Sequence, residues 1–183
     1  MVLKFETRKN PIKTLIYGLD GTGKSTAAET YCKKKGLNPV VIDVDKTNYT
    51  DIPILEVDLT RDITIVKNIT GIIKDIKEDE NFDTLIIDGV GSLLDLLTPN
   101  IKGQQAYLQR SRNFKKIWKC LLESNINIIF IGQKDLIITE ENESSRLAEK
   151  INNMVDWKFR CYREGNVFKS ECTKWRRTKE SLV

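Results

Sequence analysis

The sequence predicts an α/β protein with a mainly parallel sheet, helices on both faces and a C-terminal β-hairpin. Short runs of apolar, often β-branched residues alternate with segments that have helical periodicity. The apolar runs do not alternate with polar residues, which is typical of parallel strands buried on both faces. Near the C-terminus, Glu164-Gly165-Asn166 separates two alternating segments, and this pattern favours a hairpin turn.

The elements follow one another regularly along the chain. The pattern predicts buried strands at 13–17, 39–44, 84–88 and 126–131, a weaker strand at 54–57, and two closing strands at 156–163 and 167–175. It predicts helices at 23–35, 65–76, 104–124 and 144–154, and loops at 91–103 and 134–143. The expected core stripe of the long helix comprises Tyr107, Phe114, Trp118, Leu121 and Leu122. Another face of that helix carries Arg112, Lys116 and Lys119.

Length and composition indicate one soluble domain. The chain has 183 residues, of which 40% are hydrophobic and 31% charged, and this size suits a single core. We expect one domain over 1–183, with 1–11 as a candidate oligomerisation segment and 180–183 as a tail. No apolar run reaches the ~20 residues that span a bilayer, and the N-terminus lacks the order of a signal peptide. These features predict a cytoplasmic protein.

The cysteine and histidine content restricts the chemistry. Four cysteines occur without a C-x-x-C pair, and there is no histidine. A structural zinc site is therefore not expected, and the cysteines are interpreted as reduced thiols. Any catalysis must use carboxylates, lysine, a metal ion or a positioned water.

A phosphate-binding loop extends from Gly18 to Ser25. It fits G-x-x-x-x-G-K-[ST], follows a predicted strand and opens a predicted helix. Its glycines allow backbone N–H groups to surround a phosphate, and the positive end of the helix points at the same oxygens. The predicted nucleotide-binding residues are Gly18, Asp20, Gly21, Thr22, Gly23, Lys24, Ser25 and Thr26. We expect a nucleoside triphosphate, ATP with Mg²⁺, with Lys24 on the β- and γ-phosphates.

Asp88 ends the apolar run 85–87, where a Walker-B carboxylate would stand. We expect Asp88 to hold Mg²⁺ through water, and the Ser25 hydroxyl to ligate it directly. The alternative interpretation is a strand-end aspartate that caps the next turn.

Four stretches taken in order resemble the RecA-like P-loop NTPases. They are GLDGTGKST (18–26), TLIIDG (84–89), NIIFIGQ (127–133) and CTKWRRTK (172–179). The chain is most similar to the short phage-encoded RecA-like ATPases of the Sak type, which act in single-strand annealing and recombination, and the similarity covers about residues 12–179. The resemblance implies an oligomer, ring or filament, with ATP at the subunit interfaces, in the host cytoplasm if the protein is phage-encoded.

The resemblance also implies roles for individual residues. Gln133 matches the polar sensor after Walker B, although a strand-end glutamine can also be satisfied by backbone. Lys174 and Arg176 resemble the K-x-R pair that reaches a neighbour's ATP, although they can equally form a solvated basic strand end. A catalytic carboxylate is expected after the second strand, where Asp45 is favoured over Asp43. The family generally uses glutamate there, so an aspartate is a departure.

Single-stranded DNA is the partner that the resemblance implies. Two DNA-facing loops would map to 91–105 and 134–146, and the candidate contacts are Lys102, Arg110, Arg112 and Lys134. The second loop also carries acidic residues that oppose a phosphate backbone, and a basic helix face is often only a solvated surface. A phage single-strand binding protein, or a regulator that senses this protein, is a further expected partner.

Two other functions remain open from the sequence. One is a small P-loop kinase acting on a nucleotide or metabolite, although no arginine-rich lid segment is apparent. The other is a nucleotide-dependent protein-binding module that does not hydrolyse its ligand.

Overall fold

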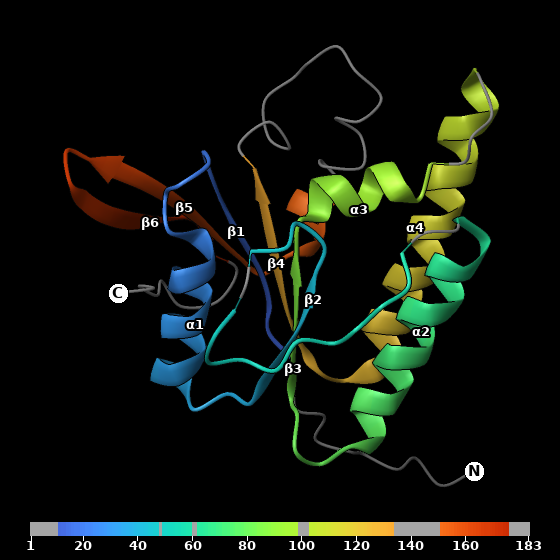
Figure 1. Cartoon of the computed structure of the whole chain (residues 1–183), viewed down its shortest axis with the longest axis horizontal. Coiled ribbons are helices and arrows are strands. Elements are labelled where there is room, and N and C mark those ends of the chain that lie inside the picture. The colour runs from blue at the N-terminus through green and yellow to red at the C-terminus, as the bar shows by residue number, and fades with distance from the viewer. Residues whose placement is uncertain (1–10, 48, 60–61, 99–102, 134–150, 176–183) are drawn as a thin grey trace, which may run out of the picture.

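A six-stranded sheet with the order β2-β3-β4-β1-β5-β6 runs through the middle of the molecule (Figure 1). The computed structural model describes residues 11–47, 49–59, 62–98, 103–133 and 151–175. The strands are β1 (Lys13–Gly18), β2 (Pro39–Asp43), β3 (Thr84–Asp88), β4 (Asn127–Gln133), β5 (Trp157–Glu164) and β6 (Val167–Trp175). All neighbours are parallel except β5 and β6, which form the antiparallel hairpin at one edge. The predicted fold class is confirmed.

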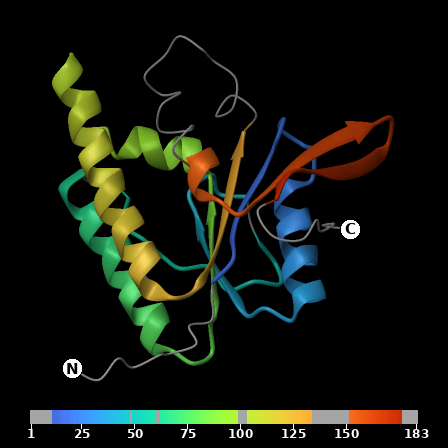
Figure 2. The same cartoon turned by 180° about the vertical axis from the view of Figure 1, so that it is seen from behind.

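Helices cover both faces of the sheet. They are α1 (Lys24–Lys35), α2 (Asp62–Glu78), α3 (Val90–Leu96) and α4 (Gln104–Ser124). Helix α1 lies on one face, and α2, α3 and α4 lie on the other, as the front and back views agree (Figures 1 and 2). Because β1 to β4 are parallel, their carboxyl ends meet at one edge of the sheet, where ligands bind in open α/β folds.

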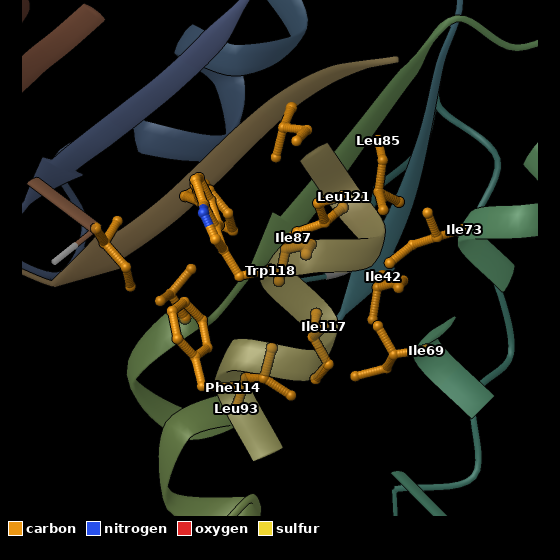
Figure 3. Packing of buried hydrophobic residues seen from close by; sticks show 14 of the residues in the cluster. Ile42, Ile69, Ile73, Leu85, Ile87, Leu93, Phe114, Ile117, Trp118 and Leu121 are labelled. Atoms are coloured by element: carbon orange, nitrogen blue, oxygen red, sulfur yellow. The ribbon is translucent and has the colours of Figure 1, made fainter. Parts of the chain in front are cut away.

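Alternate residues of each central strand enter two separate cores. Leu15, Ile42 and Ile87 pack toward α2 and α4, whereas Ile16 and Ile86 pack toward α1. In the first core, Trp118 of α4 stacks between Phe114 and Phe130, with ring centroids 6.3 and 5.8 Å apart (Figure 3). Burial on both faces explains why the strands are apolar throughout.

Three expectations about local structure were wrong. Residues 91–96 of the expected loop at 91–103 belong to α3, because Val90, Leu93 and Leu94 share one buried face at helical spacing. The expected strand at 54–57 is reduced to a single bridge between Val41 and Ile54. Tyr107 and Leu122, placed in the core stripe of α4, are exposed.

Several predicted segments lie outside the described residues. They include 1–10 of the candidate oligomerisation segment, the whole loop 134–143, and the tail 180–183. Of the short helix expected at 144–154, residues 151–154 are described and are helical.

Candidate functional site

The predicted phosphate loop connects β1 to α1 and is tightly built at its start. A Cβ atom on Gly18 would lie 2.3 Å from the carbonyl oxygen of Cys161 on β5. It would also lie 2.6 Å from the Thr22 hydroxyl, which itself donates to the Leu19 carbonyl at 2.7 Å. Only glycine therefore fits between the loop and β5 at this position.

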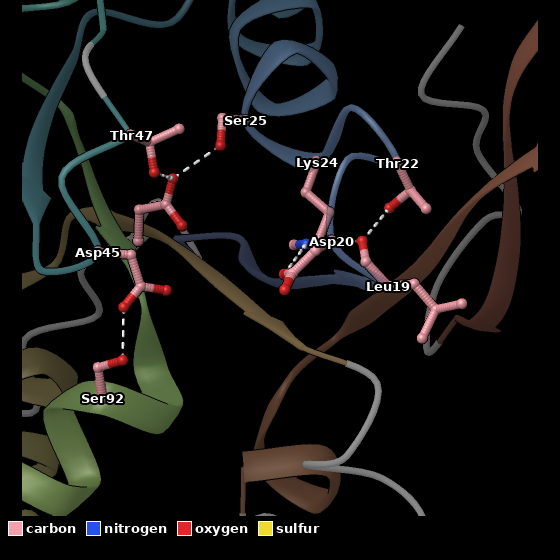
Figure 4. A network of polar contacts seen from close by, with 9 residues as sticks. Leu19, Asp20, Thr22, Lys24, Ser25, Asp45, Thr47 and Ser92 are labelled. Carbon is pink, nitrogen blue, oxygen red and sulfur yellow. Dashed lines mark hydrogen bonds and ion pairs between the residues drawn. The ribbon is translucent and has the colours of Figure 1, made fainter.

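Lys24 lies inside the loop. Its ammonium donates to the Leu19 carbonyl at 2.9 Å and lies 3.9 Å from the Asp20 carboxylate (Figure 4). The positive end of α1 starts at the same place, and the first turn of α1 carries no acidic residue to oppose an anion. The loop thus offers a lysine and a helix N-terminus to the same bound phosphate.

Asp88 lies at the end of β3 and is 3% exposed. Its Oδ2 atom accepts hydrogen bonds from the hydroxyls of Ser25 at 2.8 Å and Thr47 at 3.2 Å (Figure 4). It also accepts one from the Tyr49 hydroxyl at 2.6 Å. Burial, and next the negative charge of Asp88, raise the pKa of Tyr49 above its ordinary value, so the phenol remains a donor. The structure therefore brings Ser25 and Asp88 together, as the sequence predicted.

Asp45 follows the end of β2 and lies against α3 and the N-terminal cap of that helix. Ser92 donates to Asp45 Oδ1 at 2.5 Å. A Cβ atom on Gly89 would lie 2.5 Å from the Asp45 carboxylate, and Gly89 has φ +90°. Both the close contact and the positive φ therefore require glycine at this position. Asp43 instead accepts from the Thr47 backbone N–H at 2.9 Å and holds the turn.

One cavity of about 560 Å³ joins these groups. Its lining is Asp20, Gly21, Gly23, Lys24, Ser25, Thr26, Asp45, Thr47, Asp88, Gly132 and Gln133. Asp45 and Gln133 therefore face the same space as the phosphate loop, whereas Asp43 is not among the lining residues. The arrangement can bind a phosphorylated ligand and place carboxylate and amide groups beside it.

The oxygen donors in this cavity fit a magnesium ion. Ser25, Thr47 and Asp88 supply hydroxyl and carboxylate oxygens within one hydrogen-bonded group. Among the described residues, no three or more His, Cys, Asp or Glu side chains are grouped so that they could hold a metal ion by themselves. Mg²⁺ commonly binds through one or two carboxylates plus substrate phosphates and water, so a single buried Asp88 beside the phosphate loop suits it.

A second cavity of about 460 Å³ adjoins the first and shares Asp20 and Gly21 with it. Its lining is Gly18, Leu19, Asp20, Gly21, Thr22, Arg160, Cys161, Tyr162 and Arg163. The Arg160 guanidinium lies 5.6 Å from the Tyr162 ring centre, and Arg163 lies 5.5 Å from that of Phe168. Planar cationic and aromatic groups therefore border the loop on the β5 side.

The remaining predicted residues lie elsewhere or outside the described chain. Lys174 pairs with Lys158, which pairs with Leu15, so it lies level with the middle of β1, on the edge strand β6. Its ammonium donates to the Asn152 carbonyl. Arg176, Lys102 and Lys134 fall outside the described residues.

The expectation that Arg110 is available to DNA was wrong. Arg110 is 5% exposed, and its guanidinium lies 5.0 Å from the centre of the Tyr107 ring. A side chain covered in this way cannot track a phosphate backbone. Arg112, Lys116 and Lys119 of the same helix are exposed, as expected.

Sequence reasoning missed Thr47, Tyr49, Ser92 and Gly89. The hydroxyl groups come from a turn after β2 and from α3, which no motif marks. Gly89 had a usable signal, because a glycine directly after a Walker-B aspartate indicates a position that needs positive φ or close approach.

No helix in the described part of the chain is long and apolar enough to cross a membrane.

A comparison with curated proteins found no match. Among solved structures, a KaiC-like protein from the hyperthermophilic archaeon Pyrococcus horikoshii is similar, with a TM-score of 0.61 and 18% identity. The similarity covers 94% of this chain and 82% of the archaeal chain, and it supports the fold. The family model for the AAA domain, AAA_24, matches residues 10–180. The chain therefore belongs to the AAA_24 family of AAA domains and is a P-loop ATPase with a RecA-like fold.

Proposed function

We propose that this protein is a RecA-like phage recombination ATPase of the Sak type, which uses ATP and Mg²⁺ to act on single-stranded DNA as an oligomer. Its action on DNA would be annealing, strand exchange or loading. The observation that carries the ATP-hydrolysing part of the proposal is the single cavity shared by Lys24, Asp45, Asp88 and Gln133. The recombination role on DNA rests on the resemblance. An anion site alone would explain the loop, but it would not explain a second carboxylate and an amide facing the same space.

In ATP hydrolysis, each of these groups would have a distinct role. The loop N–H groups and Lys24 hold the β- and γ-phosphates. Asp45, fixed by Ser92, orients a water and accepts its proton as the water oxygen attacks the γ-phosphorus. The bond to the β-phosphate oxygen breaks, and that oxygen leaves on ADP. Gln133 contacts the γ-phosphate or the attacking water.

Ser25 and Asp88 would hold the magnesium ion, which supplies charge neutralisation between the β- and γ-phosphates when bound. The hydrogen bond between the two residues orients the serine oxygen toward the phosphate cavity. The second cavity supports a nucleotide over a simple phosphate. Both volumes lie within the ~300–1,000 Å³ of small-molecule sites, and Arg160 and Tyr162 can stack on a base.

The position of Lys174 supports action on a neighbouring subunit. Lys174 is not among the residues that line its own phosphate cavity, and it lies on the edge strand β6, level with the middle of β1. A role for Lys174 in phosphate chemistry is therefore proposed on a second copy of the chain, together with Arg176 as the resemblance implies. A cation supplied in trans stabilises the charge of the transferring phosphoryl, worth about 10³–10⁵ in rate in other NTPases.

Contact with DNA is proposed at the exposed cations of α4. Arg112, Lys116 and Lys119 are exposed and carry the basic face. They are proposed to contact phosphates, which gives binding that weakens as salt rises. Lys102 and Lys134 remain candidates by their place in the sequence.

The test is ATP hydrolysis measured with and without single-stranded DNA over a range of protein concentrations. We expect turnover to rise with DNA and with self-association, and Lys24→Ala to abolish turnover. Arg112→Ala should weaken DNA binding and its stimulation of turnover. Lys34→Ala, which removes an exposed cation from α1 on the other face of the sheet, serves as the matched control.

Turnover that needs neither DNA nor self-association would contradict the proposal. Phosphate transfer to a nucleoside monophosphate would identify a kinase instead. Nucleotide binding without any turnover would identify a binding module.

A further inference from the structure

The carboxylate of Asp88 carries more hydrogen bonds on one oxygen than the oxygen has lone pairs. Ser25, Thr47 and Tyr49 all donate to Oδ2, and the phenol of Tyr49 makes the shortest contact at 2.6 Å. A carboxylate oxygen offers about two lone-pair sites. A further donor, such as a metal-bound water, therefore cannot join Oδ2 without displacing one of the three.

These hydroxyls compensate a buried charge. Asp88 is 3% exposed, and the nearest loop cation, Lys24, donates to the Leu19 carbonyl and lies near Asp20. A buried carboxylate is costly unless hydrogen bonds replace its water shell. Tyr49 packs its ring against the α1-side core and turns only its hydroxyl to Asp88.

We propose that Thr47 and Tyr49 form a hydroxyl clasp that stands in for magnesium-bound water on Asp88 and leaves Asp88 when Mg²⁺ and nucleotide bind. The inference rests on the proposed function only in taking Asp88 as the residue that holds magnesium. Ser25 is the donor that stays, because it belongs to the phosphate loop and its oxygen is itself a metal ligand. Tyr49 is thus a positioning residue that sets the magnesium dependence of the site.

The clasp also connects the metal to the carboxylate proposed for catalysis. Thr47 lines the phosphate cavity, and Asp45 is two residues before it on the same turn. The turn is held by the backbone N–H of Thr47 on Asp43. Release of Thr47 and Tyr49 from Asp88 would therefore leave the turn that carries Asp45 held by Asp43 and Ser92 when the metal is present.

The direction of the effect follows from linkage. A contact made only in the metal-free form stabilises that form and opposes metal binding. Removing the Tyr49 hydroxyl should therefore destabilise the metal-free protein and strengthen its response to magnesium. If the contact were purely structural and present in both forms, its removal would destabilise the metal-free and the metal-bound protein equally.

The experiment compares Tyr49→Phe with wild type in two measurements. The first is binding of a non-hydrolysable ATP analogue at a series of Mg²⁺ concentrations, where we expect the half-saturating Mg²⁺ concentration to fall about tenfold. The second is thermal melting, where we expect the midpoint in EDTA to fall by about 3–6 °C and to recover with Mg²⁺ and analogue. Thr47→Val, which removes the longer contact, should act in the same direction and less strongly.

Tyr17→Phe is the matched control, since its hydroxyl donates to Thr173 at 3.3 Å rather than to a carboxylate. It should leave the magnesium dependence unchanged. An unchanged or raised magnesium requirement in Tyr49→Phe would overturn the clasp, as would an equal fall of both melting midpoints. If wild type binds no analogue, the proposed function fails, and melting with Mg²⁺ alone against EDTA still decides whether Tyr49→Phe changes the response to the metal.

Discussion

The position of the Asp45 carboxylate is set by close contacts with two other residues. Gly89 on the chain after β3 and Asp45 on the turn after β2 approach so closely that no side chain fits at position 89. Ser92 then fixes the carboxylate from α3. Asp45 lines the phosphate cavity, and its position there therefore depends on Gly89 and Ser92, neither of which lines that cavity.

We predict that Gly89→Ala costs about 2–3 kcal/mol of unfolding free energy, because alanine disfavours positive φ and its Cβ collides with Asp45. ATP turnover should fall with it, since Asp45 is displaced. Gly71→Ala in the interior of α2, where nothing lies within 4 Å of the added Cβ, should stabilise by about 0.5–1 kcal/mol. Denaturant unfolding measures both, and equal effects of the two substitutions would refute the close contact.

Two buried thiols give the protein a predicted sensitivity to high pH. Burial raises the pKa of Cys32 to about 12 and that of Cys161 to about 11, both from 9.0. A folded-state pKa above the unfolded value contributes stability that is complete below pH 9 and is lost as pH rises toward 11–12. The double variant Cys32→Ala/Cys161→Ala should be less stable at pH 8 but should lose less stability between pH 9 and 11. Denaturant unfolding across this range would show parallel curves if the thiols did not contribute.

At the scale of the elements, the sequence predicts the central strands and three of the four described helices because their apolar periodicity is strong. Helix α3 was missed because Pro99 and Gly103 suggested a loop, although Val90, Leu93 and Leu94 have helical spacing. The core face of α4 was drawn too wide, because periodicity cannot tell which flank of an apolar stripe meets the sheet. Only packing against β4 shows that Trp118 is inside and Leu122 outside.

This difference within α4 can be measured. Trp118→Ala should cost about 3–5 kcal/mol, since it removes the ring stacked on Phe114 and Phe130. Leu122→Ala, at a position 47% exposed, should cost less than about 0.5 kcal/mol. Comparable losses for both substitutions, measured by denaturant unfolding, would show that the helix is rotated from the position described.

For the whole molecule, the parallel order of β1 to β4 explains why the site could be predicted in outline. Carboxyl ends of parallel strands meet at one edge, so residues following β1, β2, β3 and β4 come together. The P-loop, Asp88 and Gln133 are marked by sequence order alone. The Thr47 and Tyr49 contacts are not, because a turn side chain reaches Asp88 only once β2 and β3 are paired in register. The failure of Arg110 as a DNA contact has the same cause: burial depends on neighbours distant in sequence.

The measurement that tests the central claim most directly separates nucleotide binding from hydrolysis in Asp45→Asn. The substitution keeps the size of the side chain but removes its charge and its capacity to accept a proton. We predict that it binds the ATP analogue within about twofold of wild type and that its single-turnover hydrolysis falls by about 10²-fold or more. Lys24→Ala should instead lose binding. Hydrolysis by Asp45→Asn at the wild-type rate would contradict the account, because the cavity would then hold the nucleotide without using the carboxylate that faces it.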